Sequence, residues 1–389
     1  MKKLIIILLM FLLIPLNVQA YTSDPVKDSG PVIDKEQTMQ VEELYDYITN
    51  MKTKYEILND IDVQTYVKQY IKSGDGKLST KKVFNALLIY GFREVVACGK
   101  LMSMIIIICI ICALISNLEN AFSNGNLSNI AYFACYAMLI ILISRTFYIG
   151  VSTARDTIKN MTDFLAALMP VLLMLLATVG GFTQAAFMDP LIIGVTNISA
   201  RIFADLIIPL VSISFVIQFV NNISEEYKVD KLAKLLNKTI LWVQGTIMTI
   251  FIGIVTIRSM TTATIDAVTE KTMKFAVDSF IPIVGKSLSD AISTVAGYSL
   301  LLKNALSSIG LIILVIIIIL PLIKILIMAF IYKLTAALIE PISDSRLVKC
   351  ISSAGDSLIL IMASVISVSV MFFIMISIVA AAGRSILGT

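Results

Sequence analysis

Histidine is absent from this sequence of 389 residues. Its absence excludes histidine-based acid–base catalysis, histidine metal sites and Ser-His-Asp triads. The sequence also has no HExxH, GxSxG, Walker or Rossmann glycine motif, and its apolar segments lack the paired carboxylates of an intramembrane hydrolase or proton pump. We therefore expect no catalytic, cofactor-binding or metal-binding residues, and we predict that the protein is not an enzyme.

Charged residues are few, 15% of the chain, and their net charge of +4 is spread along it. There is no basic stripe of the kind that binds nucleic acid, so we expect no nucleic-acid partner. Hydrophobic residues instead make up 58% of the sequence and the mean hydropathy is +0.90, whereas soluble domains are about 45–50% apolar. This composition indicates an integral membrane protein, with lipid as a partner.

Cysteine is present five times, and four of the five lie in or beside apolar runs. Cys109 and Cys112 have the spacing of a redox or metal pair, but they lie among isoleucines in a predicted span. Such a pair lacks the polar, electropositive surroundings that activate a thiol. We interpret both as small residues at a helix contact, and the pattern implies no disulfide framework.

The N-terminal part divides into a leader and a polar segment. Residues 1–20 have a basic start, a short apolar run and a small-residue cleavage site, which together predict a signal peptide; an uncleaved anchor is the alternative. Residues 21–94 are polar, and we expect them to be exported and mostly helical. An apolar seam from Val41 to Leu58 predicts a helix that packs against a neighbour of the same segment or against a partner.

Residues 95–389 form the predicted membrane domain. A stretch of about 20 apolar residues is long enough to cross a bilayer as a helix, and the sequence holds about seven of them. They are 95–116, 129–149, 163–183, 203–220, 239–259, 309–332 and 357–381. The predicted fold class is therefore all-α, a polytopic helical membrane protein preceded by a small helical exported segment.

An amphipathic helix is predicted directly before the sixth span. In residues 283–302, apolar residues recur on one helical face, and Lys286 and Asp290 fall on the opposite face. Such a helix lies in the membrane interface or lines a polar cavity. It leads into the span through Lys303, Asn304 and a short Ser-Ser-Ile-Gly link.

Several polar or helix-breaking residues fall within or beside the predicted spans. Pro321 interrupts the sixth span, and Lys324 follows it too far from either end to reach the interface easily. We predict that Lys324 faces a polar interior or pairs with a carboxylate of another helix, such as Asp290 or Asp205. Arg201 lies four residues before Asp205 at a membrane edge, where the two form an ion pair or line a conduit.

The sidedness of the loops remains open. Seven spans after a cleaved leader place ten basic loop residues outside the cytoplasm and six inside, which is opposite to the positive-inside rule. Either the leader dominates the orientation or one span is misassigned. The amphipathic helix and residues 191–203 are the segments most open to reassignment.

Segments around the sixth span resemble a known family. They are FIPIVGKSLSDA at 280–291, SLLLKNA at 299–305 and GLIILVIIIILPLIKIL at 310–326. They are similar to the stage III sporulation protein AE family of endospore-forming bacteria, as is the order of leader, polar segment and spans. The resemblance implies a component of a complex in the mother-cell membrane around the forespore. It implies partners among the other stage III sporulation A-operon proteins and, directly or indirectly, the stage II sporulation protein Q.

The resemblance also implies a transenvelope channel that keeps the forespore active during late development, without catalytic residues. We therefore interpret the candidate site residues as structural or conduit-lining. They are Lys286, Asp290, Lys303, Asn304, Pro321, Lys324, Arg201 and Asp205. A self-contained secondary transporter or channel for a small solute is the alternative. Such a transporter usually has internal repeats, and none is evident.

Overall fold

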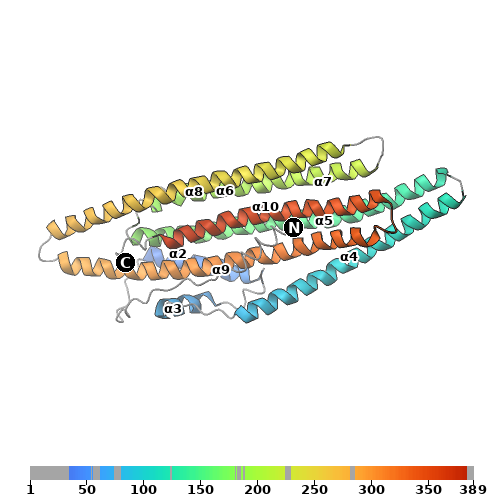
Figure 1. Ribbon diagram of the computed structural model, residues 1–389. Coiled ribbons are helices and arrows are strands. Elements are labelled where there is room, and N and C mark those ends of the chain that lie inside the picture. The colour runs from blue at the N-terminus through green and yellow to red at the C-terminus, as the bar shows by residue number, and fades with distance from the viewer. Residues whose placement is uncertain are drawn as a thin grey trace.

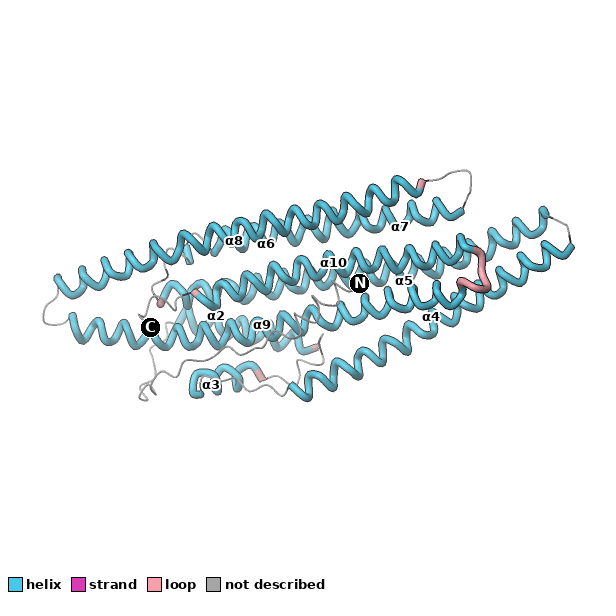
Figure 2. The backbone as a smooth tube through the Cα atoms, viewed as in Figure 1, coloured by secondary structure: helices cyan, strands magenta, loops and turns pink. Residues whose placement is uncertain are grey.

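The computed structural model describes residues 35–53, 55, 62–73, 80–122, 125–179, 181, 185–186, 189–223, 229–280 and 285–382. These residues form helices and no strand, which confirms the all-α prediction (Figure 2). Long helices run along the axis of an elongated bundle, and the shorter α2 and α3 lie beside them (Figure 1). The predicted leader, residues 1–20, lies outside the described residues.

Within the described residues, six helical stretches are long and apolar enough to cross a membrane. They are Asn85–Ile115, Tyr136–Thr178, Pro190–Val220, Asp230–Arg258, Ala296–Ile339 and Ser345–Ala381. This confirms a polytopic helical membrane protein, with six candidate spans where the sequence predicted about seven.

The difference arises in α5. α4 (Thr80–Phe122) and α5 (Gly125–Thr178) form a hairpin that extends beyond the other helices at the right of Figure 1. The stretch 129–149 and residues 163–178 of the stretch 163–183, predicted as two spans, both belong to α5, so the predicted loop between them was wrong. The helix continues because the residues between the two stretches bury one face in the core, including Ala154, Ile158 and Met161. Their polar side chains lie on the other face.

The next span contains an irregular turn. α6 (Asp189–Ile202), a π-turn at Phe203–Ile207 and α7 (Ile208–Ile223) follow one another without a loop. The amide of Ile208 bonds to the carbonyl of Phe203, five residues earlier. The π-turn directly precedes Pro209, which cannot donate the usual bond to residue i−4, so the wider turn accommodates the proline.

α8 (Asp230–Phe280) and α9 (Gly285–Ile339) are each a single long helix. Residues 285–302 of the predicted amphipathic helix and the sixth span both lie in α9, so the predicted link between them was wrong. Its glycine, Gly310, allows a close helix contact instead of a break, since a Cβ there would lie 2.7 Å from Cδ2 of Leu168 in α5. At 1.5 Å per residue α9 is about 82 Å long, whereas a hydrocarbon layer is about 30 Å thick.

α10 (Ser345–Ala381) packs along α9 and α5, and these three helices form the centre of the core. The carboxylate of Asp344 caps its first turn and accepts a 2.8 Å hydrogen bond from the amide of Arg346. Cysteines also contribute to the core, where they pack as small apolar residues. Four of them, Cys98, Cys109, Cys112 and Cys350, are buried and form no disulfide.

The polar N-terminal segment contributes α2 (Lys35–Lys52), which contains most of the predicted seam, and α3 (Val63–Ser73). The apolar seam of α2 is buried at Leu44, Ile48 and Met51. It packs against α5, and α3 packs against α9. The seam therefore faces the membrane bundle, and not a second helix of its own segment.

Candidate functional site

The middle of α5 carries polar side chains within a candidate membrane span. Arg155, Asp156, Lys159 and Asp163 are exposed, and Asn160 is half-buried. At 3.6 residues per turn these five side chains fall on one side of the helix, opposite to the side that packs into the core. We call these five residues the α5 polar face.

α2 covers part of the α5 polar face. The Nδ2 atom of Asn160 donates a 2.9 Å hydrogen bond to Oη of Tyr55. Burial, followed by the charge of Asp163, raises the pKa of Tyr47 to about 12. Burial also raises the pKa of Tyr55; the hydrogen bond with Asn160 lowers it in part, and the charge of Asp156 raises it. The neutral phenols of Tyr47 in α2 and of Tyr55, three residues after α2, therefore lie beside the charged groups of α5.

Two side-chain contacts give the position of the α5 polar face along the bundle. Gln244 of α8 donates a 2.6 Å hydrogen bond to Oγ of Ser364 in α10. Five residues later, about 7.5 Å along the helix, Ser369 contacts the sulfur of Met161 in α5 at 3.5 Å. Met161 lies between the polar residues of α5 in sequence. The α5 polar face therefore lies level with the apolar middle of α8.

A lysine of α9 holds the end of α10. The side chain of Lys303 is completely buried and donates hydrogen bonds to the backbone carbonyls of Val379 (3.1 Å), Ala380 (3.2 Å) and Ala382. Carbonyls in the last turn of a helix lack partners in that helix and carry the negative end of its dipole. Lys303, a candidate from the sequence, thus joins α9 to the C-terminal end of α10.

A second lysine of α9, Lys333, contacts the first half of α10. It donates hydrogen bonds to Oγ of Ser352 at 2.9 Å and to Oδ2 of Asp356 at 2.7 Å. The two helices approach closely at Gly355, where a Cβ would lie 3.2 Å from both the carbonyl oxygen of Ala329 and Cγ of Lys333. Sequence reasoning missed this ion pair, although Asp356 is the acidic residue directly before the predicted span 357–381.

Lys324 is half-buried in α9. The thiol of Cys98 in α4 lies within electrostatic range of both Lys324 and Glu94. α4 and α9 are close together there, since a Cβ on Gly91 would lie 3.9 Å from Ile323. Lys324 and the carboxylate of Glu94 therefore both lie near the Cys98 thiol, at the contact of α4 with α9.

The carboxylates that the sequence suggested for Lys324 are not its partners. Asp290 belongs to the same continuous helix and lies about 51 Å away along it. Among the described side chains, neither Lys324 nor Arg201 forms an ion pair with Asp205. Arg201 and Asp205 are both exposed. Asp205 belongs to the π-turn, in which the α-helical alignment of residues four apart is lost.

The other candidates from the sequence belong to α9 and not to α5. Asn304 is half-buried, and its Oδ1 has no hydrogen-bond partner in the described part of the chain. Pro321 is half-buried within α9. Lys286 and Asp290 belong to the helical start of α9, and their side chains lie outside the described set. No cluster of three potential metal ligands occurs among the residues that the structure describes.

Sequence reasoning missed the α5 polar face because it assigned residues 150–162 to a loop. The available signal was the spacing, since Arg155, Lys159 and Asp163 follow one another at intervals of four, and Asp156 and Asn160 do the same. That spacing places side chains on one side of a helix.

Comparison with known proteins gives a consistent result over most of the chain. The model of the family described as stage III sporulation protein AE matches residues 61–383. Stage III sporulation protein AE of Bacillus subtilis (strain 168) is 35% identical over 347 residues, which are 89% of this chain and 87% of that protein. No solved structure matches.

Proposed function

Because this chain belongs to the stage III sporulation protein AE family, we propose that it is the membrane subunit of a transenvelope channel between mother cell and forespore. Its location is then the mother-cell membrane around the forespore, and its activity supports late forespore development. Its partners are other stage III sporulation A-operon proteins and, directly or indirectly, the stage II sporulation protein Q.

The α5 polar face is the observation that supports a conduit subunit best. An Arg, Lys or Asp side chain in the centre of a membrane helix costs about 2.5–3.5 kcal/mol on insertion scales. Four such groups on one exposed face of α5 are therefore unsuited to contact with lipid tails. α2 covers only part of them, so water in a conduit or another protein must contact the rest.

The uncovered surface of α4 supports an assembly as well. Only 22% of its most apolar stretch is buried, against 56% in α9 and in α10. Large apolar side chains are exposed along it, including Met104, Ile107, Ile111 and Leu114. This surface suits the transmembrane helices of other subunits.

The conduit is tested by measuring spore yield in a sporulating host that carries a variant with an uncharged α5 polar face. The variant carries Arg155→Gln, Asp156→Asn, Lys159→Gln and Asp163→Asn, which leave the net charge unchanged and remove all four charges. We expect normal protein level and membrane insertion, with a loss of heat-resistant spores of at least about tenfold. The matched control is Lys72→Gln with Glu340→Gln, which removes one exposed charge of each sign away from the α5 polar face and should leave spore yield unchanged. Full spore yield from the α5 variant would contradict the proposal.

The test of the assembly is photo-cross-linking from the same face. A photoreactive residue in place of Lys159 should form adducts with another A-operon protein during sporulation. If the purified chain alone instead moves solute across liposomes, and no protein adduct forms, the protein is a self-contained transporter or channel.

A further inference from the structure

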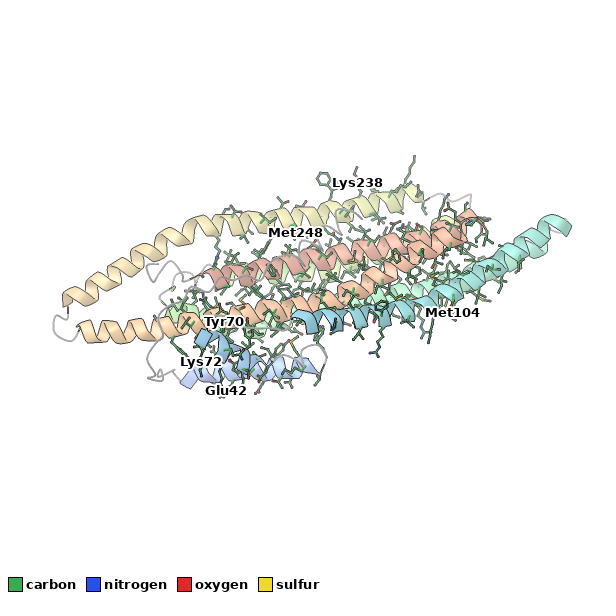
Figure 3. All side chains as sticks on the ribbon, turned by 60° about the horizontal axis from the view of Figure 1, so that its bottom comes forward. Glu42, Tyr70, Lys72, Met104, Lys238 and Met248 are labelled. Carbon is green, nitrogen blue, oxygen red and sulfur yellow. The ribbon has the colours of Figure 1, made fainter. Side chains whose placement is uncertain are left out.

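The outer surface of α8 carries lysines followed by an exposed tryptophan. Lys231, Lys234 and Lys238 are exposed in its first turns, and Figure 3 shows Lys238 projecting from the edge of the bundle. Trp242, the only tryptophan of the chain, is 70% exposed one turn later. At 3.6 residues per turn, these four side chains fall within an arc of about 80°.

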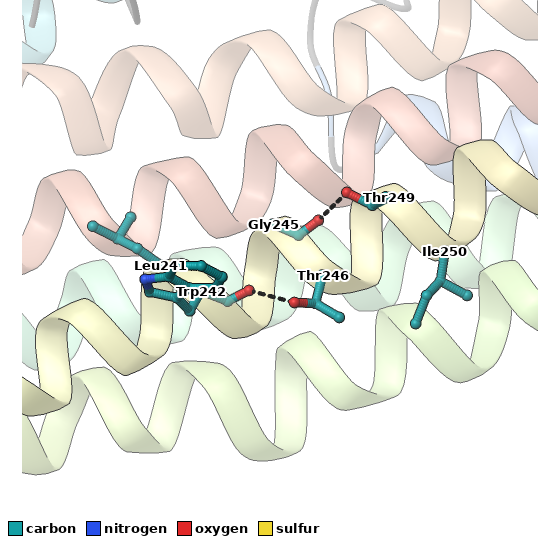
Figure 4. A pocket seen from close by; sticks show the side chains of 6 residues that line it. All are labelled: Leu241, Trp242, Gly245, Thr246, Thr249 and Ile250. Carbon is teal, nitrogen blue, oxygen red and sulfur yellow. Dashed lines mark hydrogen bonds between the residues drawn. The ribbon is translucent and has the colours of Figure 1, made fainter.

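A groove of about 470 Å³ continues along this surface (Figure 4). It is lined by Leu241, Trp242, Gly245, Thr246, Thr249 and Ile250. Gly245 keeps it open, since a Cβ there would meet no atom within 4 Å. The hydroxyls of Thr246 and Thr249 donate to the backbone carbonyls of Trp242 and Gly245, at 2.9 and 2.8 Å. Because these hydroxyls are already bonded within α8, the groove presents mainly apolar surface.

Two of the three lysines at the entrance of the groove carry a positive charge that no described carboxylate neutralises. Lys234 pairs with Asp230 at 2.5 Å, while Lys231 and Lys238 form no ion pair with any described side chain. Leu232 and Leu235 are exposed between them. Basic and apolar residues alternating in this way are typical of a helix segment at the membrane surface, where lysines attract anionic headgroups.

The length of α8 fits this placement. Twenty residues separate Lys238 from Arg258, the last residue of the candidate span. At 1.5 Å per residue they cover about 30 Å, which is the thickness of the hydrocarbon layer. Lys238 then lies at the headgroups, Trp242 at the boundary that tryptophan prefers, and the groove beside the acyl chains.

We propose that the start of α8 is a binding site for an anionic phospholipid. Lys231 and Lys238 bind the headgroup phosphate, and one acyl chain lies in the groove along Gly245 and Thr249. A phospholipid fits both the lysines and the groove. Its negative headgroup is joined to an apolar chain, just as the lysines at the start of α8 are followed by the apolar groove. The site begins at the start of α8, whereas the α5 polar face lies on a different helix, level with the apolar middle of α8, so lipid and conduit contact different surfaces.

The experiment uses Trp242 as the single reporter in the purified full chain. The chain is reconstituted in phosphatidylcholine vesicles containing either brominated phosphatidylglycerol or brominated phosphatidylcholine at equal mole fraction. Bromine quenches tryptophan fluorescence on contact, so quenching measures occupancy beside Trp242. We expect phosphatidylglycerol to be preferred about five-fold for each free lysine, and bromine near the headgroup end of the chain to quench more than bromine at the bilayer centre.

Three variants decide the outcome. Lys231→Gln with Lys238→Gln should abolish the preference, whereas Lys68→Gln with Lys72→Gln, which removes the same charge from exposed positions of α3, should retain it. Gly245→Leu fills the groove without a clash and should reduce quenching by both lipids. Equal quenching by the two lipids in the wild type, or an unchanged preference in the α8 lysine variant, would overturn the proposal. If neither brominated lipid quenches the fluorescence of Trp242, the proposal is also overturned, because a protein helix would then occupy the groove.

Discussion

Lys303 and Val379 lie 76 positions apart in the chain, and the ammonium group of the first donates a 3.1 Å hydrogen bond to the backbone carbonyl of the second. This contact fixes α9 against the end of α10, while Lys333 and Asp356 join the same two helices 2.7 Å apart nearer the other end. The two lysines together set the register of the helix pair at the centre of the core.

Replacing Lys303 with methionine should loosen the end of α10. The variant keeps a long side chain and removes the hydrogen bonds to the carbonyls, each of which is worth about 1.5–3 kcal/mol when one partner is charged. We expect a lower unfolding temperature in detergent and faster amide exchange in the last turn of α10, measured by mass spectrometry. Lys68→Met, at an exposed position of α3, is the control. Unchanged exchange in the last turn would show that Lys303 does not hold it.

The class of fold was predictable because it depends on composition and on apolar runs. The runs at 239–259, 309–332 and 357–381 all lie in helices that can cross a membrane.

The continuity of α5 and α9 was not predictable from the same rules. Polar residues between two apolar runs usually mark a loop, but those of α5 occupy one face while Ala154 and Ile158 bury the other. The glycine of the predicted link in α9, Gly310, allows contact with Leu168. Both effects depend on the neighbouring helix, which lies far away in the sequence.

The partners of the candidate lysines could not be predicted from the sequence either. Lys303 binds backbone carbonyls. Every residue has such a carbonyl, so the sequence does not show which one accepts the hydrogen bond. Lys324 is half-buried, and only the packing of α4 on α9 brings it and Glu94 within electrostatic range of the same thiol, that of Cys98.

Lys324 should be needed for sporulation through a polar contact. With normal protein level, Lys324→Leu should reduce the yield of heat-resistant spores, and Lys324→Glu should reduce it further because it sets a like charge near Glu94. Combining Lys324→Glu with Glu94→Lys restores opposite charges and should recover part of the yield. Glu340→Gln, an exposed position at the end of α9, serves as the control. If Lys324→Leu forms spores normally, this lysine has no functional role.

Six spans reverse the sidedness of the loops relative to seven. With residues 21–94 exported, the α7–α8 and α9–α10 connections then face the cytoplasm. These regions carry seven basic residues, Lys228, Lys231, Lys234, Lys238, Lys333, Arg346 and Lys349. Arg145, Arg155 and Lys159 are not counted, because they lie in the middle of α5, far from both of its ends, whereas the seven lie in a connection or within about two turns of one. The opposite side then carries six, Arg258, Lys271, Lys274, Lys286, Lys303 and Arg384, so the bias of seven to six has the direction of the positive-inside rule.

Cysteine labelling tests this orientation. In a chain whose native cysteines are replaced by alanine, Ile342→Cys lies in the α9–α10 connection and Lys72→Cys lies on α3, both at exposed positions. A membrane-impermeant thiol reagent added to intact cells should label Lys72→Cys and leave Ile342→Cys unlabelled until the membrane is opened. The reverse pattern would mean that the bundle is inserted the other way round.

Asp344 should stabilise the start of α10 in a manner that depends on pH. Partial burial raises its pKa, but hydrogen bonds from the side chain and backbone of Arg346 outweigh burial and hold the pKa below the ordinary value of 3.8. A carboxylate with a lowered pKa contributes stability that is fully present above its unfolded-state pKa and is lost as the pH falls through the folded value. Asp344→Asn keeps a good N-cap and removes the charge, so it isolates this contribution.

The difference in unfolding free energy between wild type and Asp344→Asn should be constant from neutral pH down to about pH 5. It should shrink as the pH falls below 3.8, as Asp344 becomes protonated. Because the ion pair with Arg346 is partly exposed, we expect a difference of about 0.2–1 kcal/mol at neutral pH. Asp344→Ala also removes the cap and should cost about 1 kcal/mol more at every pH. Chemical unfolding in detergent at a series of pH values measures both, and a difference for Asp344→Asn that persists unchanged to acid pH would contradict the assignment.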